Sequence, residues 1–240
     1  MHFLSNKSDK LQGYCTYDAF SEVLAKLLEI GLGSSDLVFV TGDISQDESL
    51  ESYRLALSQF EKIGADIYWI PGNHDDEYKL NLIFSASKNM RRLRTLSTDH
   101  WDFISINTCR VGTDEGHIEQ HEMASFKREL AKSQNDKKNI VVVMHHHPVP
   151  VATPLMDECM LKNNQDFLNV LAGNSEIKLI ICGHVHGDYK ILLNDKFLET
   201  CPATCFQWEK GTSIVKPENS RGFKIFNFSE NSYTSSTLFV

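Results

Sequence analysis

The sequence predicts an α/β fold in which helices and mixed sheets form the layers of a single domain, residues 1–240. Segments with strand-like and helical hydrophobic spacing alternate through most of the chain, and hairpin patterns follow them. No internal repeat, low-complexity tract or linker divides the chain. With 240 residues, 41% of them hydrophobic, the chain is long enough to bury one full core.

The expected elements follow from the spacing of apolar residues and from the glycines and turn residues between them. The expected helices are residues 18–30, 48–63, 120–132 and 164–172. The expected strands are residues 37–41, 67–70, 102–107, 140–144 and 177–182. Residues 189–193 and 197–201 flank an Asn-Asp turn and predict a hairpin, residues 222–228 predict a last strand, and the polar residues 210–220 predict a surface loop.

Four of the expected strands run into polar segments rich in possible metal ligands. These segments are Gly42-Asp43, Gly72-Asn73-His74-Asp75, His145-His146-His147-Pro148 and Cys182-Gly183-His184-Val185-His186-Gly187. One such segment alone is more often an ordinary turn or a core histidine, but independent turns would not all fall at strand ends. The four together predict a metal site at the carboxyl ends of several strands.

The segments contribute carboxylate, amide and imidazole ligands. The spacing of His184 and His186 by two residues on extended backbone turns both imidazoles to one side. The carboxylate of Asp43 can bridge two cations, and the amide oxygen of Asn73 is a hard neutral ligand. The neighbouring His74 would point the other way, toward a substrate. In the histidine triplet, successive side chains point to opposite faces of the strand, so at most two of the three can lie on the same face.

Oxygen and nitrogen ligands without a thiolate suit Mn, Fe, Zn or Co with five or six ligands. Two such cations about 3.5–4 Å apart can share an activated hydroxide and bind the oxygens of a phosphoryl group. A histidine beside them, His74, could protonate the departing alkoxide.

The net charge and the cysteine content indicate which classes of partner and which cellular location to expect. The formal net charge of −8 argues against coating a nucleic-acid polymer, but a bound metal pair can locally attract a small phosphorylated substrate. No apolar run reaches the roughly 20 residues of a membrane span, and no signal peptide opens the chain. The six cysteines form no CxxC pair and predict reduced thiols. We therefore expect a cytoplasmic protein without membrane or nucleic-acid partners.

The motifs resemble those of the calcineurin-like metallophosphoesterases, and in finer detail their class III cyclic-nucleotide phosphodiesterase branch. The segments that carry the resemblance are Gly42-Asp43-Ile44-Ser45-Gln46, Gly72-Asn73-His74-Asp75, Met144-His145-His146-His147-Pro148-Val149-Pro150, Cys182-Gly183-His184-Val185-His186 and Pro202-Ala203-Thr204-Cys205-Phe206-Gln207. They span nearly the whole chain. The resemblance implies a four-layer α/β/β/α sandwich with two mixed sheets and a dinuclear centre.

The resemblance also implies residue roles. Asp43 would bridge two metal ions, with Asn73, His146 and His184 on one ion and His186 and His2 on the other. His146 is selected from the triplet because the family's ligand stands two residues before the proline. His74 would be the proton donor, oriented by either Gln46 or Asp75.

The chain departs from the family pattern at its amino end, where the family has a strand that ends in Asp-x-His. His2 matches the histidine, but the aspartate would lie before Met1, so the first strand is expected to be missing. Either the true start lies upstream, or the first metal has lost a ligand. In the second case we expect a weakened metal site, low activity, or rescue by rearrangement or by a homodimer.

The function implied is a metal-dependent hydrolysis of a cyclic nucleotide, 3',5'-cAMP to AMP, by the dinuclear centre and its bridging hydroxide. Two alternatives stay open. One is a broader phosphodiesterase that acts on glycerophosphodiesters or other small phosphoesters. The other is a catalytically impaired protein that uses the fold for binding, because the first aspartate ligand is missing. The substrate depends on the resemblance alone, since the sequence shows no adenine pocket.

Overall fold

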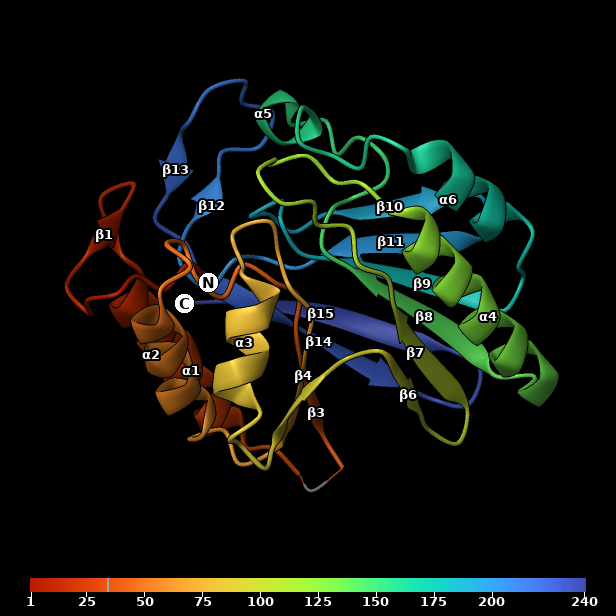
Figure 1. Ribbon diagram of the computed structural model, residues 1–240, viewed down its shortest axis with the longest axis horizontal. Helices are drawn as coiled ribbons and strands as arrows, with labels where there is room; N and C mark the ends of the chain where they lie inside the picture. The colour runs from red at the N-terminus through yellow and green to blue at the C-terminus, as the bar shows by residue number, and fades with distance from the viewer. Residues whose placement is uncertain (34) are drawn as a thin grey trace.

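Helices, a sheet, a second sheet and further helices form the successive layers of the computed structural model (Figure 1). It describes residues 1–33 and 35–240, apart from the side chains of residues 134–136. The four-layer α/β/β/α architecture expected from the sequence is confirmed. Among the described residues, no helix is both long enough and apolar enough to cross a membrane.

The first sheet has three parallel strands, in the order β3 (Leu37–Val40), β4 (Asp66–Trp69) and β5 (Met90–Arg92). On its outer side lie α1 (Thr16–Ile30), α2 (Leu50–Phe60) and α3 (Glu77–Phe84). Aromatic and aliphatic side chains, among them Phe20, Phe60 and Trp69, form the core between these helices and the sheet. Burial of this apolar surface is the main force that holds the layer together.

The second sheet has six strands and is mixed. Its order is β10 (Lys190–Leu193), β11 (Lys196–Thr200), β9 (Ile177–Cys182), β8 (Asn139–Met144), β7 (Trp101–Ser105) and β6 (Thr95–Ser97). The four inner strands are parallel, and the two edge strands pair antiparallel. Helices α4 (Gln120–Asp136) and α6 (Asn164–Ala172) cover its outer face (Figure 1).

The central strand β8 shows why this sheet has a core on each side. Successive side chains of a strand point to opposite faces. Accordingly Val141 and Val143 belong to the core between the two sheets, whereas Val142 and Met144 belong to the core under α4 and α6. Both faces are buried, which explains the uninterrupted apolar run that ends at Met144.

The remaining elements lie around this sandwich. The hairpin of β14 (Gly222–Phe228) and β15 (Tyr233–Phe239) packs Phe226 and Phe228 against the core between the sheets. Four two-residue strands and one short helix complete the described chain: β1 (Lys10–Leu11), β2 (Tyr14–Cys15), β12 (Gln207–Trp208), β13 (Pro217–Glu218) and α5 (Pro154–Asp157).

The structure corrects several expectations. The first sheet is parallel rather than mixed, and β14 pairs with β15 in a separate sheet, so residues 222–228 are not the last strand. Residues 210–220, expected as a loop, include β13. Elements α3, β5, β6 and β15 were not expected. In β15 half-buried and exposed positions alternate without a strong apolar run, which leaves little hydrophobic signal in the sequence.

The first residues are ordered against the segment that follows β3. His2 and Phe3 donate their backbone N–H groups to the carbonyls of Asp43 and Ile44, and Phe3 forms a parallel bridge with Ser45. The side chain of Phe3 is fully buried in the core beneath α1. These contacts place His2 inside the molecule, so it does not behave as a frayed terminal residue.

Candidate metal centre

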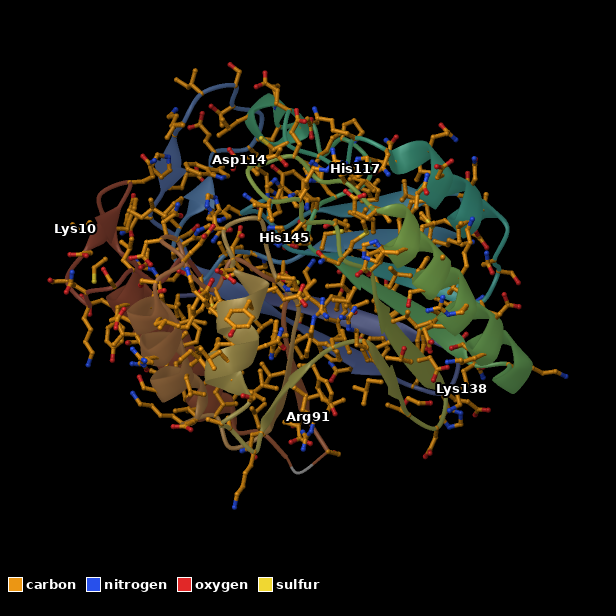
Figure 2. The ribbon with its side chains drawn as sticks, in the orientation of Figure 1. Lys10, Arg91, Asp114, His117, Lys138 and His145 are labelled. Carbon is orange, nitrogen blue, oxygen red and sulfur yellow. The ribbon has the colours of Figure 1, made fainter. Side chains whose placement is uncertain are left out.

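The four ligand-rich segments meet where the carboxyl ends of strands from both sheets come together. Asp43 follows β3, Asn73 follows β4, His145 follows β8 and His184 follows β9. His145 lies near the middle of the molecule (Figure 2). Because parallel strands end at one edge of a sheet, segments distant in sequence converge there, as expected from the sequence.

The backbone at these strand ends is tightly folded. Asp43, His184 and His186 all have positive φ, at 52°, 64° and 47°, which is uncommon for residues other than glycine. A Cβ at Gly72 would lie 2.1 Å from Oδ1 of Asp43, so only glycine fits there. Such backbone occurs in ordinary turns elsewhere in the described chain, as at Asn194, but three of these residues gather at one place here.

Asp43 lies at the centre of the site and is almost completely buried. Its Oδ2 is 3.2 Å from Nε2 of His145 and 3.6 Å from Nε2 of His2, while Oδ1 accepts the backbone N–H of His74 at 3.1 Å. Burial alone would raise the pKa of Asp43, but the charge and hydrogen bond of His145 outweigh it and hold this pKa well below its usual range. The ionised carboxylate thus faces imidazoles on two sides.

One of these sides is formed by His2 and His186, whose Nε2 atoms are only 2.8 Å apart. Nδ1 of His186 is 3.1 Å from the carbonyl oxygen of Phe206, and Nδ1 of His2 is 2.8 Å from Oε1 of Gln46. Carbonyl and amide oxygens only accept hydrogen bonds, so each Nδ1 carries the ring proton. Both Nε2 atoms then present lone pairs to each other.

The two facing lone pairs fit a shared cation. Burial lowers the pKa of His2 well below its usual range and that of His186 to about 3, so neither ring carries a charge. Two neutral acceptors in contact repel each other unless a cation lies between them and Asp43. A hydrogen bond from the other ring nitrogen to an acceptor is also how metal-binding imidazoles are oriented.

The other side is formed by Asn73, His145 and His184. Oδ1 of Asn73 is 3.0 Å from Nε2 of His145 and 3.1 Å from Nδ1 of His184. The amide is oriented by its Nδ2, which donates to Asp114 at 3.3 Å, and Nδ1 of His145 donates to the carbonyl of Thr41 at 2.7 Å. These three donor atoms and the Asp43 carboxylate could hold a second cation.

His146, selected by its distance from the proline, has different contacts. Its Nδ1 is 2.8 Å from the hydroxyl of Thr108, and its Nε2 is buried without a hydrogen-bond partner. One ligand atom from each of His145, His146 and His184 lies within 4.8 Å of the others, so His146 stays close to the centre. Only His145, however, contacts both Asn73 and Asp43.

Two residues near the centre had no role in the sequence analysis. His145 could have been found from the end of the preceding strand, because the first residue after a buried strand is the one that reaches the sheet edge. Cys205 brings a ligand atom within 4.8 Å of His2 and His186. Its segment carries part of the family resemblance, but the resemblance implied no ligand there, and Cys205 lies about 20 residues beyond the histidine pair.

His74 lies beside His2, with ring centroids 5.2 Å apart in an edge-to-face arrangement. Its Nδ1 is 3.3 Å from Nε2 of Gln46. The amide N–H donates, so Nδ1 of His74 accepts and the ring proton sits on Nε2. Gln46 rather than Asp75 therefore contacts the His74 ring.

Asp75 has a structural position behind the centre. Its carboxylate accepts backbone N–H groups from Ile44, Ser45 and Gly72. Burial, followed by the negative charge of Asp43, raises the pKa of Asp75 to about 6. These bonds tie the segment after β3 to the turn after β4 and so hold Asp43 against Asn73.

Several known proteins are similar to this chain in sequence, and they carry names of cyclic nucleotide phosphodiesterases. A probable cyclic nucleotide phosphodiesterase of Coxiella burnetii is 33% identical over 208 residues, which cover 87% of this chain and 83% of the relative. A probable cyclic nucleotide phosphodiesterase of Xenorhabdus bovienii is 32% identical over 242 residues, 100% of this chain and 97% of its own. The 3',5'-cyclic adenosine monophosphate phosphodiesterase CpdA of Haemophilus influenzae is 28% identical over 87% of this chain and 75% of its own.

A solved structure shares the fold. A dimetal phosphatase from Danio rerio superposes with a TM-score of 0.68 over 93% of this chain and 88% of its own, at 13% sequence identity. The sequence model of the family described as Calcineurin-like phosphoesterase matches residues 1–188. The chain therefore belongs to the calcineurin-like phosphoesterases.

Proposed function

We propose that this protein is a phosphodiesterase that hydrolyses a 3',5'-cyclic nucleotide, cAMP to AMP, with two metal ions as cofactors. The observation that carries the proposal is the position of the buried Asp43 carboxylate. It lies between two groups of donor atoms, 3.6 Å from Nε2 of His2 and 3.2 Å from Nε2 of His145. A carboxylate there can serve one cation on each side.

The chain's own donor atoms divide into two sets. His2, His186 and Asp43 would hold one cation, and Asn73, His145, His184 and Asp43 would hold the other. His145 takes the place that the sequence analysis gave to His146, because it alone contacts Asn73 and Asp43. Nitrogen and oxygen donors of this kind accept Mn, Fe or Zn.

When bound, a pair of cations supplies an activated water and stabilises charge on the phosphoryl oxygens. The side chains of the protein position the substrate and supply the proton for the leaving group. The donor atoms fix where the phosphoryl group binds, and His74 presents its Nε2–H to the departing alkoxide oxygen. A His74 ring that has taken up a second proton from water can give up the Nε2 proton and return to a neutral imidazole. In the neutral ring, the Gln46 amide keeps the proton on Nε2, because it donates to Nδ1.

The substrate class follows from the relatives, which carry names of cyclic nucleotide phosphodiesterases. A net charge of −8 supports a small phosphodiester rather than a nucleic-acid polymer, whose binding needs clustered Lys and Arg. The six cysteines are free thiols, which supports a cytoplasmic location. A homodimer stays a prediction.

The test is hydrolysis by the full chain, stripped of metal and then reloaded with Mn²⁺. The substrates are 3',5'-cAMP, a glycerophosphodiester and bis(p-nitrophenyl) phosphate, with Asp43→Ala as the inactive control. We expect Mn²⁺-dependent conversion of cAMP to AMP. Turnover of the glycerophosphodiester without cAMP would contradict the substrate and favour the broader phosphodiesterase. Bound metal without any turnover would favour a binding protein instead.

A further inference from the structure

Cys205 lies in the loop between β11 and β12 and is fully buried against the His2 and His186 side of the centre. One ligand atom from each of these three residues lies within 4.8 Å of the other two. The backbone N–H groups of Cys205 and Phe206 lie within hydrogen-bonding reach of the sulfur. The buried thiol thus sits beside ring nitrogens of His2 and His186.

The loop that carries Cys205 is held by the histidine it faces. The carbonyl of Phe206 accepts from Nδ1 of His186, and Trp208 donates its backbone N–H to the carbonyl of His186. The indole of Trp208 also stacks on the His186 ring, with centroids 5.5 Å apart and planes 19° apart. Cys205 therefore keeps a fixed position relative to His186, and little conformational freedom is left to lose on binding a ligand.

Hydrogen bonds within the loop also fix its conformation. The side chain of Gln207 accepts the backbone N–H of Ala203 at 3.1 Å and donates to the carbonyl of the same residue at 2.7 Å. These two bonds close the turn in which Cys205 sits. The thiol is thereby presented by a rigid loop, as a metal-binding side chain needs.

We propose that Cys205 is a ligand of the cation held by His2 and His186. With Asp43, whose Oδ2 is 3.6 Å from Nε2 of His2, the donors become two imidazole nitrogens, one sulfur and one carboxylate oxygen. Four protein donors of these types are what a tetrahedral zinc site uses. On binding, the S–H bond breaks, its proton passes to solvent, and the sulfur lone pair bonds to the cation.

The two halves of the centre then differ in the cations they prefer. Sulfur is a soft ligand, so the Cys205 half selects Zn²⁺, Fe²⁺ or Co²⁺ over Mn²⁺. The Asn73, His145 and His184 half contains no sulfur and accepts Mn²⁺ more readily. This inference rests on the proposed function because it supposes the two-cation centre, and it makes that centre mixed in its metal content.

The test is a titration of the metal-free full chain with Co²⁺, followed by absorption spectroscopy. Visible d–d bands report any bound Co²⁺, whereas a near-ultraviolet sulfur-to-cobalt charge-transfer band reports a thiolate ligand. We expect both in the wild-type chain. Cys205→Ser should lose the charge-transfer band and keep the d–d bands. Cys109→Ser is the matched control, because Cys109 also lies near Asp43, and it should keep both.

The outcomes separate the two proposals. Wild-type d–d bands without a charge-transfer band, or a charge-transfer band that survives in Cys205→Ser, would overturn the role of Cys205 and leave the two-cation centre standing. No d–d bands at all would overturn the centre itself. If Cys205→Ser fails to fold, the wild-type spectrum still tests the proposal, because the charge-transfer band must be present in the wild-type chain.

A selectivity measurement adds a second readout that does not depend on activity. Equilibrium dialysis against Zn²⁺ or Mn²⁺, with elemental analysis, gives the affinity of each variant for each cation. Cys205→Ser should weaken Zn²⁺ binding at least about tenfold and Mn²⁺ binding much less, because a lost direct ligand costs no less than a lost supporting hydrogen bond. An equal loss for both cations would contradict the sulfur ligand.

Discussion

The Gln46 side chain connects the two imidazoles on which the proposed chemistry depends most. Its amide oxygen lies 2.8 Å from Nδ1 of His2, and its amide nitrogen lies 3.3 Å from Nδ1 of His74. A single amide thereby leaves a lone pair on Nε2 of His2 for a cation and a proton on Nε2 of His74 for a leaving group. One side chain thus sets the tautomer of both rings.

Replacing His74 tests the second of these roles. His74→Ala should lower cAMP hydrolysis by about 10²–10⁴-fold, the usual contribution of a general acid. Hydrolysis of bis(p-nitrophenyl) phosphate should fall much less, because its phenolate leaves without a proton, and the metal content should stay near that of the wild-type chain. Steady-state kinetics on both substrates check this. Equal losses on both would remove His74 as the proton donor.

The choice between His145 and His146 is also testable. Asp43, despite the opposing effect of burial, raises the pKa of His145, so a cation must displace a proton from this ring. Metal affinity should therefore increase as the pH rises through the raised pKa of His145. His145→Ala should weaken metal binding at least about tenfold, whereas His146→Ala should lower it less. Calorimetric titrations over a range of pH measure both effects, and the reverse order would return the ligand role to His146.

Among the elements, the turns after the strands decide whether the donor atoms meet. A Cβ at Gly72 would lie 2.1 Å from Oδ1 and 2.2 Å from the backbone nitrogen of Asp43, so the two segments can approach only with glycine at this position. Gly72→Ala should push Asp43 away from Asn73 and abolish metal binding and activity. The matched control is Gly173→Ala at the end of α6, where the nearest atom to a new Cβ is 3.6 Å away.

Circular dichroism and elemental analysis of the two glycine variants check this prediction. We expect Gly173→Ala to fold and to bind metal like the wild-type chain. Normal metal content and turnover in Gly72→Ala would show that the close approach of these two turns does not matter for the centre.

The elements also show what the sequence can and cannot predict. The bounds of α6 and β9 match the sequence prediction, because each is a strong apolar pattern bounded by polar or glycine residues. The distinction between His145 and His146 depends on where β8 ends, at Met144, and element ends are the least certain feature of a sequence prediction. Cys205 and His2 are distant in the sequence but have ligand atoms within 4.8 Å of each other, and no local pattern encodes this proximity.

At the scale of the whole molecule, a buried charge network joins the second sheet to the β14–β15 hairpin. Glu199 in β11 is fully buried and contacts Lys224 at 3.0 Å, Tyr233 at 2.9 Å and Ser235 at 3.0 Å. Lys224 is also paired with Asp188 at 2.6 Å. These contacts fasten the hairpin beside the loops that carry His186 and Cys205.

Burial alone would raise the pKa of Glu199, but hydrogen bonds from Lys190, Ser235 and Lys224 outweigh it and lower this pKa. A carboxylate with a lowered pKa stabilises the fold above its unfolded pKa of about 4.3, and the contribution disappears as the pH falls through the folded value. Glu199→Gln should therefore lower the free energy of unfolding at neutral pH. The expected loss is about 3 kcal/mol, the lower end for a broken buried pair, since Lys224 keeps Asp188.

Urea unfolding at neutral pH and in acid measures this effect. The difference between wild type and Glu199→Gln should shrink in acid. The matched control is Glu209→Gln, whose ion pair with Lys216 is exposed and should be worth under about 1 kcal/mol. Equal losses for the two variants, or a difference independent of pH, would contradict a stabilising role of the buried network.

The most direct test of the central claim, that Asp43 serves two cations, is the metal content per chain by elemental analysis. The wild-type protein should hold about two cations and Asp43→Ala neither, while Asn73→Ala should keep the cation bound by His2 and His186. Hydrolysis of bis(p-nitrophenyl) phosphate with added Mn²⁺ should follow the two-cation state. A wild-type chain that holds one cation or none, or an Asp43→Ala variant that still holds two, would contradict the shared carboxylate.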